Sequence, residues 1–302
     1  MTLRHFRIFS EVCRLESITL AAESMNMAQP AVSYVIKEME NYYETKLFER
    51  MNRRLYITEA GEQLLLYADS ILAQFDEARD VLRDKNAVTK VKIGTNVSYG
   101  ISCLPILTAG FLKKYPEIPL YTLVENSRQI EEKLLHNELD FGIMDYPIRS
   151  EYFISSLIKK ETMSVVCAEN YSLPQSIQIQ QLQEIPLLLR EDGSGSRSLI
   201  ENILNKYKIL PNIVMESSSD RSLIEACSQC RGILFLTTAE VTPYMSSHKL
   251  REIKIEGVEI NRYYYLVYHK SKFLTKSMKF FKTYIEHEEN ERSTLQIIKS
   301  VL

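Results

Sequence analysis

Apolar residues recur at helical spacing in the first forty positions of the chain, where they predict three helices. The first predicted helix has one apolar face, made of Leu3, Phe6, Phe9, Val12 and Cys13. Ser17 is suited to cap a second, short helix around Ala21 and Ala22, because its hydroxyl can accept a bond from a free backbone amide. Asn26 can adopt the tight conformation that a turn between two helices requires.

The third predicted helix begins at Gln29-Pro30, where a proline sacrifices no backbone hydrogen bond. Its buried stripe consists of Val32, Val35, Ile36 and Met39. The other side carries polar, aromatic and basic groups, namely Pro30, Ser33, Tyr34, Lys37 and Asn41. Such a face suits the major groove of DNA, although the same periodicity also fits any helix at a protein surface.

The next segment, LFERMNRRLYITEAG, contains two short extended pieces that flank Met51–Arg54 and predict a hairpin, or wing. The hairpin carries Arg50, Arg53 and Arg54. Arginines on a wing suit DNA phosphates or a narrow minor groove. The other interpretation is a solvated basic loop, and this is the favoured one when the segment is considered by itself.

From Thr58 the apolar spacing alternates between steps of four and three, at Leu64, Ala68, Ile71, Phe75, Ala78 and Leu82. This spacing is typical of a helix that pairs with another helix, although a helix buried within one domain is the alternative. Thr58 is a suitable N-cap for this helix. The polar run 85–90 predicts a hinge.

From Val91 the chain alternates between strands and helices. The first set reads as strands VKIG, LYTLVEN and LDFGIM, with helices in ISCLPILTAGFLKKYP and SRQIEEKLLHNE. The second set has strands MSVVCAE, IPLLLRE, NIVMES and ILFLTT, with helices at about 196–207 and 222–230. The strand YYYLVYHK and a helix over 275–288 return to the first set. This order predicts two α/β lobes with mostly parallel sheets, joined by two crossovers.

Composition adds little to this picture but excludes some classes of protein. The 302 residues are 45% hydrophobic, which is ample for two or three domains, and no apolar run is long enough to span a membrane. The N-terminus lacks the apolar region of a signal peptide, and five scattered cysteines make no disulfide framework, so we expect a cytoplasmic protein. Residues 1–60 hold eight Lys/Arg and eight Glu, so DNA binding there depends on how the charges are distributed.

Residues 3–65 resemble the winged helix-turn-helix of LysR-type transcriptional regulators, through F..F..V, SITLAAESMNMAQPAVSYVIKEME, LFER and TEAG. The resemblance implies that DNA is contacted by Gln29, Pro30, Ser33, Tyr34, Lys37, Arg53 and Arg54. It also implies dimerisation through the long helix, at Leu64, Ala68, Ile71 and Phe75, within a homotetramer. Three departures stand out: Ala28 replaces a usual Ser or Thr cap, Tyr42-Tyr43-Glu44 replaces a turn with Leu-Gly, and Tyr34 stands where Arg is frequent.

The C-terminal half resembles the effector-binding domain of the same regulators, which is similar to type 2 periplasmic binding proteins. The residues that carry it are KIGTNVSYGISCLP, FLKKYPEI, LDFGI, REDGSGSRSLIENIL and ESSSDRSLIEACSQCRGILFL. In such folds ligands bind where strands end and helices begin. The expected effector contacts are Asn96, Val97, Ser98, Asn126, Ser127, Ser194, Gly195 and Ser196. Helix N-termini at these positions favour a small anion, and the alternative for GSGSR is a glycine turn with a serine cap.

Other candidate chemistry has little support. Cys227-x-x-Cys230 lies in a predicted helix without a second cysteine pair, which favours a structural role over a metal or redox site. Cys103 is expected in the core. The five histidines lack metal-ligand spacing and no catalytic motif is present, so we expect no catalytic residue, no metal and no cofactor.

Together these features predict an α/β protein in three parts. They are a winged helix-turn-helix over 1–58, a linker or dimerisation helix and hinge over 59–90, and a bilobed effector-binding domain over 91–302. Lobe I would span about 91–163 and 266–302, and lobe II about 164–265. The expected function is a regulator that binds double-stranded promoter DNA and a small, anionic effector. A solute-binding protein of the same bilobed fold is the alternative, and an enzyme on that fold is a third.

Overall fold

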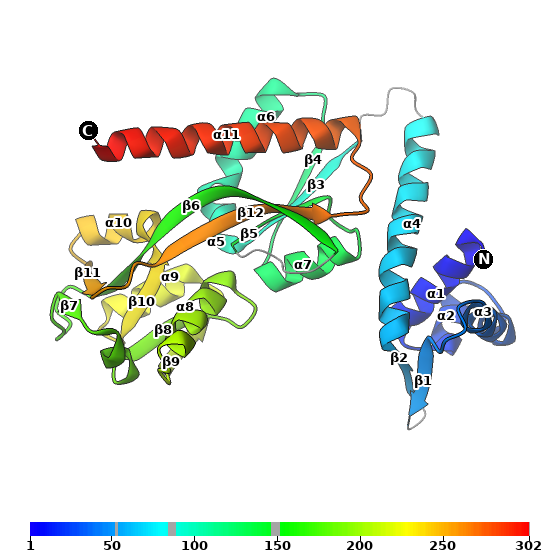
Figure 1. Ribbon diagram of the computed structural model, residues 1–302, viewed down its shortest axis with the longest axis horizontal. Helices are drawn as coiled ribbons and strands as arrows, with labels where there is room; N and C mark the ends of the chain where they lie inside the picture. Colours follow the sequence, from blue (N-terminus) through cyan, green and yellow to red (C-terminus); the bar gives the residue numbers. More distant parts are fainter. Residues whose placement is uncertain (52–53, 84–88, 146–151, 302) are drawn as a thin grey trace. The chain divides into compact units, whose positions relative to one another are not determined.

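The computed structural model describes residues 1–51, 54–83, 89–145 and 152–301, without the side chains of 77, 80, 81, 83 and 290–301. The chain folds into two compact units (Figure 1). The first comprises Met1–Thr89, Leu135–Glu138 and Ser271–Thr275. The second comprises Lys90–Leu134, Leu139–Lys270 and Lys276–Leu302. Among the described residues, no helix combines the length and apolar character of a membrane span.

The first unit contains the three predicted helices, the hairpin and the long helix. Their bounds are α1 (Leu3–Leu15), α2 (Ile18–Ser24), α3 (Gln29–Tyr42), β1 (Phe48–Met51), β2 (Arg54–Ile57) and α4 (Glu59–Arg83). The hairpin is antiparallel, with Met51 opposite Arg54. Of the predicted hinge over 85–90, residues 85–88 lie outside the described part of the chain.

Local chemistry explains where these helices start and turn. The hydroxyl of Ser17 accepts a hydrogen bond from the amide of Leu20 at 3.3 Å, which confirms the predicted cap. Asn26 has a φ of +52°, as its place between α2 and α3 predicts. Thr58 caps α4 by accepting a bond from the amide of Gly61 at 3.0 Å. The N-cap of α3, Ala28, makes no side-chain bond.

The apolar faces of these helices form one core. Ile8, Phe9 and Val12 of α1 pack with Val32, Ile36 and Met39 of α3, around the small pair Ala21-Ala22 of α2. Because alanine side chains are short, α2 can approach its neighbours closely. This packing turns the polar side of α3 outward.

The predicted pairing seam of α4 has two different environments. Ala68 is fully buried in the core of the first unit, and Leu64 is partly buried against the same core. The assignment of Ala68 to dimerisation is therefore wrong, and Leu64 is partly covered by its own domain. Further along, Ile71 and Phe75 are 40% and 48% exposed. The first part of α4 is thus buried within its own domain, whereas the part with Ile71 and Phe75 is exposed, as a helix that pairs with another helix would be.

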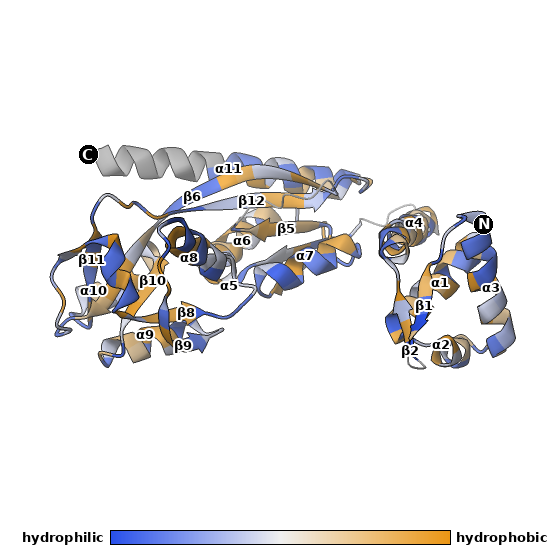
Figure 2. Cartoon of the chain, turned by 60° about the horizontal axis from the view of Figure 1, so that its bottom comes forward, coloured by the Kyte–Doolittle hydropathy of each residue, from blue (hydrophilic) through white to orange (hydrophobic). Residues whose placement is uncertain are grey.

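The second unit is built on a ten-stranded sheet of order β4-β3-β5-β12-β6-β10-β8-β9, with β11 on β6 and β7 on β11. The strands are β3 (Val91–Thr95), β4 (Leu120–Val124), β5 (Phe141–Met144), β6 (Phe153–Ala168), β7 (Ser176–Ile177), β8 (Pro186–Arg190), β9 (Asn212–Ser217), β10 (Ile233–Thr237), β11 (Leu250–Ile255) and β12 (Asn261–His269). β8 and β10 are nearly all buried and hydrophobic, as strands covered on both faces should be (Figure 2).

Two long strands join the lobes, as the two predicted crossovers require. β6 has 16 residues and pairs antiparallel with β12 from Asn261–Thr162 to His269–Phe153 (Figure 1). The three parallel strands of lobe I lie beyond β12, and those of lobe II lie beyond β6. Only the buried second part of β6 was predicted from the sequence. In its first part, FISSLIKKET, apolar and polar residues come in pairs, which does not give the alternation typical of a strand.

Helices cover the sheet. They are α5 (Val97–Ser102), α6 (Leu104–Lys114), α7 (Ser127–Leu135), α8 (Gly195–Lys206), α9 (Asp220–Ser228), α10 (Thr238–Ser246) and α11 (Lys276–Val301), with a short 3₁₀ helix at Ile179–Gln183. Of these, α5, α7, α8, α9 and α10 begin after the carboxyl ends of parallel strands, whereas α6 follows α5 and α11 follows β12. One predicted helix divides into α5 and α6 at Cys103, because Pro105 has no amide proton to continue the first helix. α10, β11 and β7 were not predicted.

Candidate functional site

The outward face of α3 presents the side chains that the sequence analysis assigned to DNA contact. Gln29, Pro30 and Lys37 are exposed, Tyr34 is 67% exposed and Ser33 is half-buried. Residues four positions apart lie on the same side of a helix, so Gln29, Ser33 and Lys37 share one edge of this face. The buried stripe on the opposite side fixes how the face is oriented in the domain.

The charges of this unit are divided between its faces. Glu11 bonds to Arg14 and Ser24, Glu38 pairs with His5, and Glu40 pairs with Lys46. In the described part of the chain, Lys37, Arg50 and Arg54 have no such carboxylate partner. Residues 1–60 hold equal numbers of Lys/Arg and Glu, yet their pairing leaves basic side chains on α3 and the hairpin available to contact DNA.

A groove of about 660 Å³ runs beside Gln29. Its lining includes the start of α2 and the hairpin residues Arg50, Arg54 and Tyr56. Backbone amides at the start of a helix and arginine side chains both bind phosphate groups. Arg54 therefore lies close to α3, whereas Arg53 is outside the described residues.

The turn after α3 is held by a carboxylate. Glu40 accepts a hydrogen bond from the amide of Leu47 at 3.0 Å and pairs with Lys46 at 2.9 Å. Glu44 takes a φ of +52° within this turn. A residue other than glycine costs about 1–2 kcal/mol in that region, so this departure from the usual Leu-Gly is tolerated at some strain.

In the second unit, the residues assigned to the effector lie where strands end and helices begin. Asn96 caps α5 by accepting a bond from the amide of Tyr99 at 3.0 Å, and Asn126 accepts one from the amide of Gln129 at 3.0 Å. Ser98, Ser127, Ser194, Gly195 and Ser196 are buried, and Val97 is half-buried. Ser194 precedes α8 but makes no cap bond, so the serine-cap alternative is wrong.

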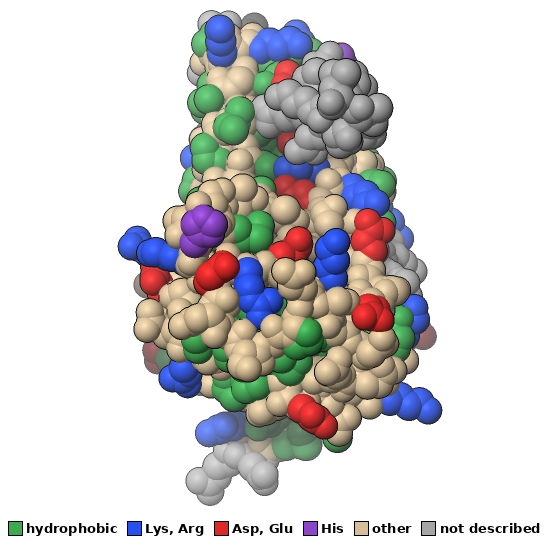
Figure 3. All heavy atoms as spheres, turned by 90° about the vertical axis from the view of Figure 1, so that its left-hand side faces the viewer, with side chains coloured by type: hydrophobic (Ala, Val, Ile, Leu, Met, Phe, Trp, Pro, Cys, Tyr) green, Lys and Arg blue, Asp and Glu red, His purple; other side chains and the backbone are tan. Residues whose placement is uncertain are grey.

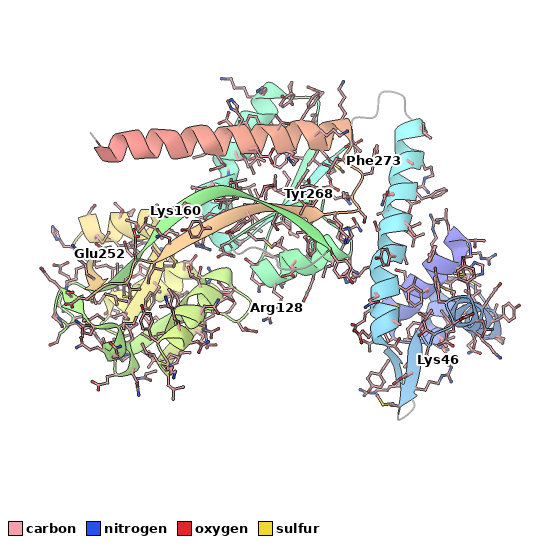
Figure 4. All side chains as sticks on the ribbon, in the orientation of Figure 1. Lys46, Arg128, Lys160, Glu252, Tyr268 and Phe273 are labelled. Carbon is pink, nitrogen blue, oxygen red and sulfur yellow. The ribbon has the colours of Figure 1, made fainter. Side chains whose placement is uncertain are left out.

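The two lobes meet directly at these helix starts. The amide of Arg128 in α7 donates to the carbonyl of Gly193 at 3.3 Å, and its guanidinium donates to Asp192 at 2.7 Å (Figure 4). Gly193 has a φ of +83°, which suits glycine. The GSGSR turn is therefore at the junction between the lobes.

Between the lobes, Asp145 and Arg262 form a buried ion pair that the sequence analysis missed. Asp145 follows β5, and its Oδ2 accepts bonds from Nε of Arg262 at 2.9 Å and from Nη2 at 2.5 Å. Its Oδ1 accepts a bond from the hydroxyl of Ser127 at 2.8 Å. Burial would raise the pKa of Asp145, but the charge of Arg262 and the hydrogen bonds hold that pKa below its usual value.

A second pair lies at the end of β8. Arg190 donates to Asp220 at 2.9 Å and to Glu191 at 2.9 Å, and the Arg190 and Asp220 side chains are nearly inaccessible. Burial raises the pKa of Asp220 despite Arg190, and burial likewise raises the pKa of Glu240 in α10. Arg190 and Arg262, the two strongly buried arginines among the described residues, are therefore each paired with a carboxylate.

Several buried polar atoms at the strand ends and helix starts of the second unit have no hydrogen-bond partner in the described part of the chain. They are Thr95 Oγ1, Asn96 Nδ2, Ser98 Oγ, Ser196 Oγ, Glu240 Oε1, Arg262 Nη1 and Tyr264 Oη. Buried polar atoms without partners are rare in proteins and call for a specific explanation. Most of these atoms can donate a hydrogen bond, so together they suit a ligand rich in acceptor atoms.

The two cysteines of Cys227-x-x-Cys230 lie in different environments. Cys227 is buried in α9, and burial raises its pKa to about 12, whereas Cys230 is exposed in the turn beyond the helix with a φ of +57°. The expectation that both lie in one helix is wrong. Among the described residues, no group of three or more His, Cys, Asp and Glu could hold a metal ion. Cys103 is buried as expected, 2.8 Å from Nζ of Lys159.

Family models match both units. The LysR substrate binding domain matches residues 85–289, and the bacterial regulatory helix-turn-helix protein, lysR family, matches residues 3–62. The HTH-type transcriptional regulator CbbR of Rhodospirillum rubrum is 33% identical over 275 residues, covering 90% of this chain and 91% of its own.

Solved structures agree in fold. HinK, a LysR family transcriptional regulator from Pseudomonas aeruginosa, has a TM-score of 0.57 at 19% identity and covers 95% of this chain and 98% of its own. The Synechocystis CcmR regulatory domain in complex with 2-PG has a TM-score of 0.61 at 21% identity and covers 66% of this chain and 97% of its own. Both the helix-turn-helix and the bilobed domain are thus accounted for, and the chain belongs to the LysR family of transcriptional regulators, which are not enzymes.

Proposed function

We propose that two or more copies of the chain bind promoter DNA in the cytoplasm through α3 and the hairpin, under the control of a small anionic effector. The observation that carries this is the exposed face of α3, where Lys37, together with Arg50 and Arg54 of the hairpin, has no carboxylate partner among the described residues. The DNA contacts are assigned to Gln29, Pro30, Ser33, Tyr34, Lys37 and Arg54, with Arg53 as a further candidate. The functional division follows the expected boundaries at 58 and 90.

The effector site is assigned to the cleft between the lobes of the second unit. Asn96, Val97, Ser98, Asn126, Ser127, Ser194, Gly195 and Ser196 would line it. Support comes from the unpartnered donors of Ser98, Ser196 and Arg262, and from the start of α8, which favours negative charge. The related CcmR domain binds 2-PG, a small anion, which agrees with this class of ligand. On the face in Figure 3, acidic and basic side chains are interspersed. The expected preference for an anionic effector therefore rests on the donors between the lobes and not on the charge of that face.

Pairing through the exposed part of α4, at Ile71 and Phe75, would give the dimer that reads two half-sites. A homotetramer would bring two such dimers together. Effector binding changes DNA binding only if the effector has different affinities for two arrangements of the assembly.

A gel shift with the DNA upstream of the chain's own gene tests this function. We expect sequence-specific binding by the full chain, and a change in affinity or in the footprint when the right small anion is added. A solute-binding protein would bind the small molecule and show no preference for this DNA over a scrambled duplex. That outcome would overturn the proposal.

A further inference from the structure

The carboxylate of Asp145 makes the contacts that a bound anion would make. One oxygen accepts the hydroxyl of Ser127, and the other accepts two bonds from the guanidinium of Arg262. A hydroxyl and a guanidinium fork are the groups that proteins use to hold carboxylate or phosphate ligands. Here the partner of both groups is a side chain of the protein itself.

This carboxylate also lies at the start of α8. Gly195 is the first residue of that 12-residue helix, and a Cβ placed on it would be 1.7 Å from Oδ1 of Asp145. The absence of a side chain at Gly195 therefore allows Asp145 to approach the helix from the other lobe. Since the N-terminus of a helix attracts negative charge, Asp145 takes up an anion position there as well.

Asp145 does not accept a hydrogen bond from every buried donor near it. Nη1 of Arg262 and the hydroxyls of Ser98 and Ser196 have no partner in the described part of the chain, and these side chains are at most 3% exposed. The arginine that binds Asp145 thus has a further donor for a ligand. A ligand with several acceptor oxygens would satisfy more of these groups than one aspartate does.

The charge of the cleft restricts how such a ligand can enter. Arg262 is neutralised by Asp145, and Arg190 by Asp220 and Glu191. An anion added beside these pairs would be a buried charge without a counter-ion, which is unfavourable. If the anion replaces Asp145 on Arg262, the new charge gains a partner.

We propose that Asp145 is a built-in competitor of the effector, whose carboxylate holds the anion position on Arg262 and at α8 until the effector's anionic group displaces it. This inference rests on the proposed function, because it concerns the same cleft. It makes Asp145 a determinant of affinity and specificity. Ligands with a phosphate or a carboxylate plus further acceptors would displace it, whereas simple monocarboxylates would compete poorly.

The test uses the full chain and inorganic phosphate as the probe, with binding followed by isothermal titration calorimetry. Asp145→Asn removes the competing charge and keeps the size of the side chain. We expect this variant to bind phosphate at least tenfold more tightly than the wild type. The matched control is Glu252→Gln, which removes one carboxylate from an exposed position of β11 (Figure 4) and should bind phosphate like the wild type. The double variant Asp145→Asn/Arg262→Gln should lose the gain.

Two outcomes would overturn the inference. One is equal or weaker phosphate binding by Asp145→Asn, which would make Asp145 an ordinary part of the site. The other is an undiminished gain in the double variant, which would place the anion away from Arg262. If Asp145→Asn does not fold, Asp145→Ser replaces it, because the smaller side chain lets water reach Arg262. Binding of each protein to its upstream DNA is measured in parallel, so failure of the proposed function is recognised separately.

Discussion

Asp145 and Arg262 are 117 positions apart in the sequence, yet they form the most buried ion pair among the described residues of the second unit. Asp145 directly follows β5 in lobe I, and Arg262 lies near the start of β12, one of the two strands that join the lobes. The pair therefore links a strand end to a lobe crossover. Its state of charge should influence both the stability of the domain and its closure.

The first prediction concerns the pH dependence of stability. The folded-state pKa of Asp145 lies below its usual 3.8, so its stabilising contribution is present above that pH and is lost as the pH falls through the folded pKa. Asp145→Asn leaves Arg262 with an unpaired buried charge, which costs roughly 3 kcal/mol at pH 7. Denaturant unfolding from pH 7 to pH 3 should show the stability gap between wild type and variant narrowing with acid. A gap independent of pH would contradict the ion pair.

The second prediction uses the missing cap of α3. Ala28 has extended backbone angles, with φ −72° and ψ 134°, which suit an N-cap residue, but its methyl group cannot accept a hydrogen bond. Ala28→Ser should therefore stabilise the first unit by about 1 kcal/mol. The converse change at an existing cap, Ser17→Ala, should destabilise it by a similar amount. Urea unfolding followed by circular dichroism measures both, and an unchanged Ala28→Ser midpoint would be inconsistent with this account.

The third prediction concerns self-association through α4. Phe75 is 48% exposed on an apolar edge with Ile71. Phe75→Glu places a charge in the proposed interface and should shift the assembly toward smaller species in light scattering after size exclusion. Gln63→Glu, at an exposed position on the same helix, serves as the matched control and should leave the mass unchanged. Identical masses for the two variants would show that the chains pair through a different surface.

The fourth prediction concerns thiol chemistry. Burial raises the pKa of Cys227 to about 12, so almost none of its thiolate is present at neutral pH. Iodoacetamide should modify exposed Cys230 in the native protein and leave Cys227 intact, as mass spectrometry of peptides would show. Cys227→Ser should respond to oxidants as the wild type does. Rapid modification of Cys227 in the native protein would contradict this prediction and support a redox role for the thiol.

Sequence periodicity predicted the elements whose faces differ most in polarity. Three helices and a hairpin in the first unit, and the parallel strands of both lobes, follow from local pattern because one face of each is buried. The first part of β6 was missed because its apolar and polar residues come in pairs and are followed by Lys159, Lys160 and Glu161, so the period of two that indicates a strand is absent. α10 contains Pro243 in its interior, which argues locally against a helix.

The position of the candidate effector site was predictable from the sequence, but its buried ion pair was not. Asn96, Ser127 and Gly195 could be named because each follows a strand or opens a helix. Asp145 follows the strand LDFGIM in the same way and could have been included on that signal. Its partner Arg262 could not, because only the fold brings the start of β12 next to β5.

The sequence-specific binding of α3 to DNA is the central claim, and it is tested most directly by measuring the base preference of that binding together with its salt dependence. Fluorescence anisotropy with the DNA upstream of the gene would compare wild type, Lys37→Ala and Tyr34→Ala across a range of salt concentrations. Lys37→Ala should weaken binding to all sequences and reduce the slope of log K against log salt by about 1, as loss of one phosphate contact predicts. Tyr34→Ala should change the preference among operator bases with little effect on the slope. Binding of both variants with the affinity, slope and sequence preference of the wild type would contradict the account.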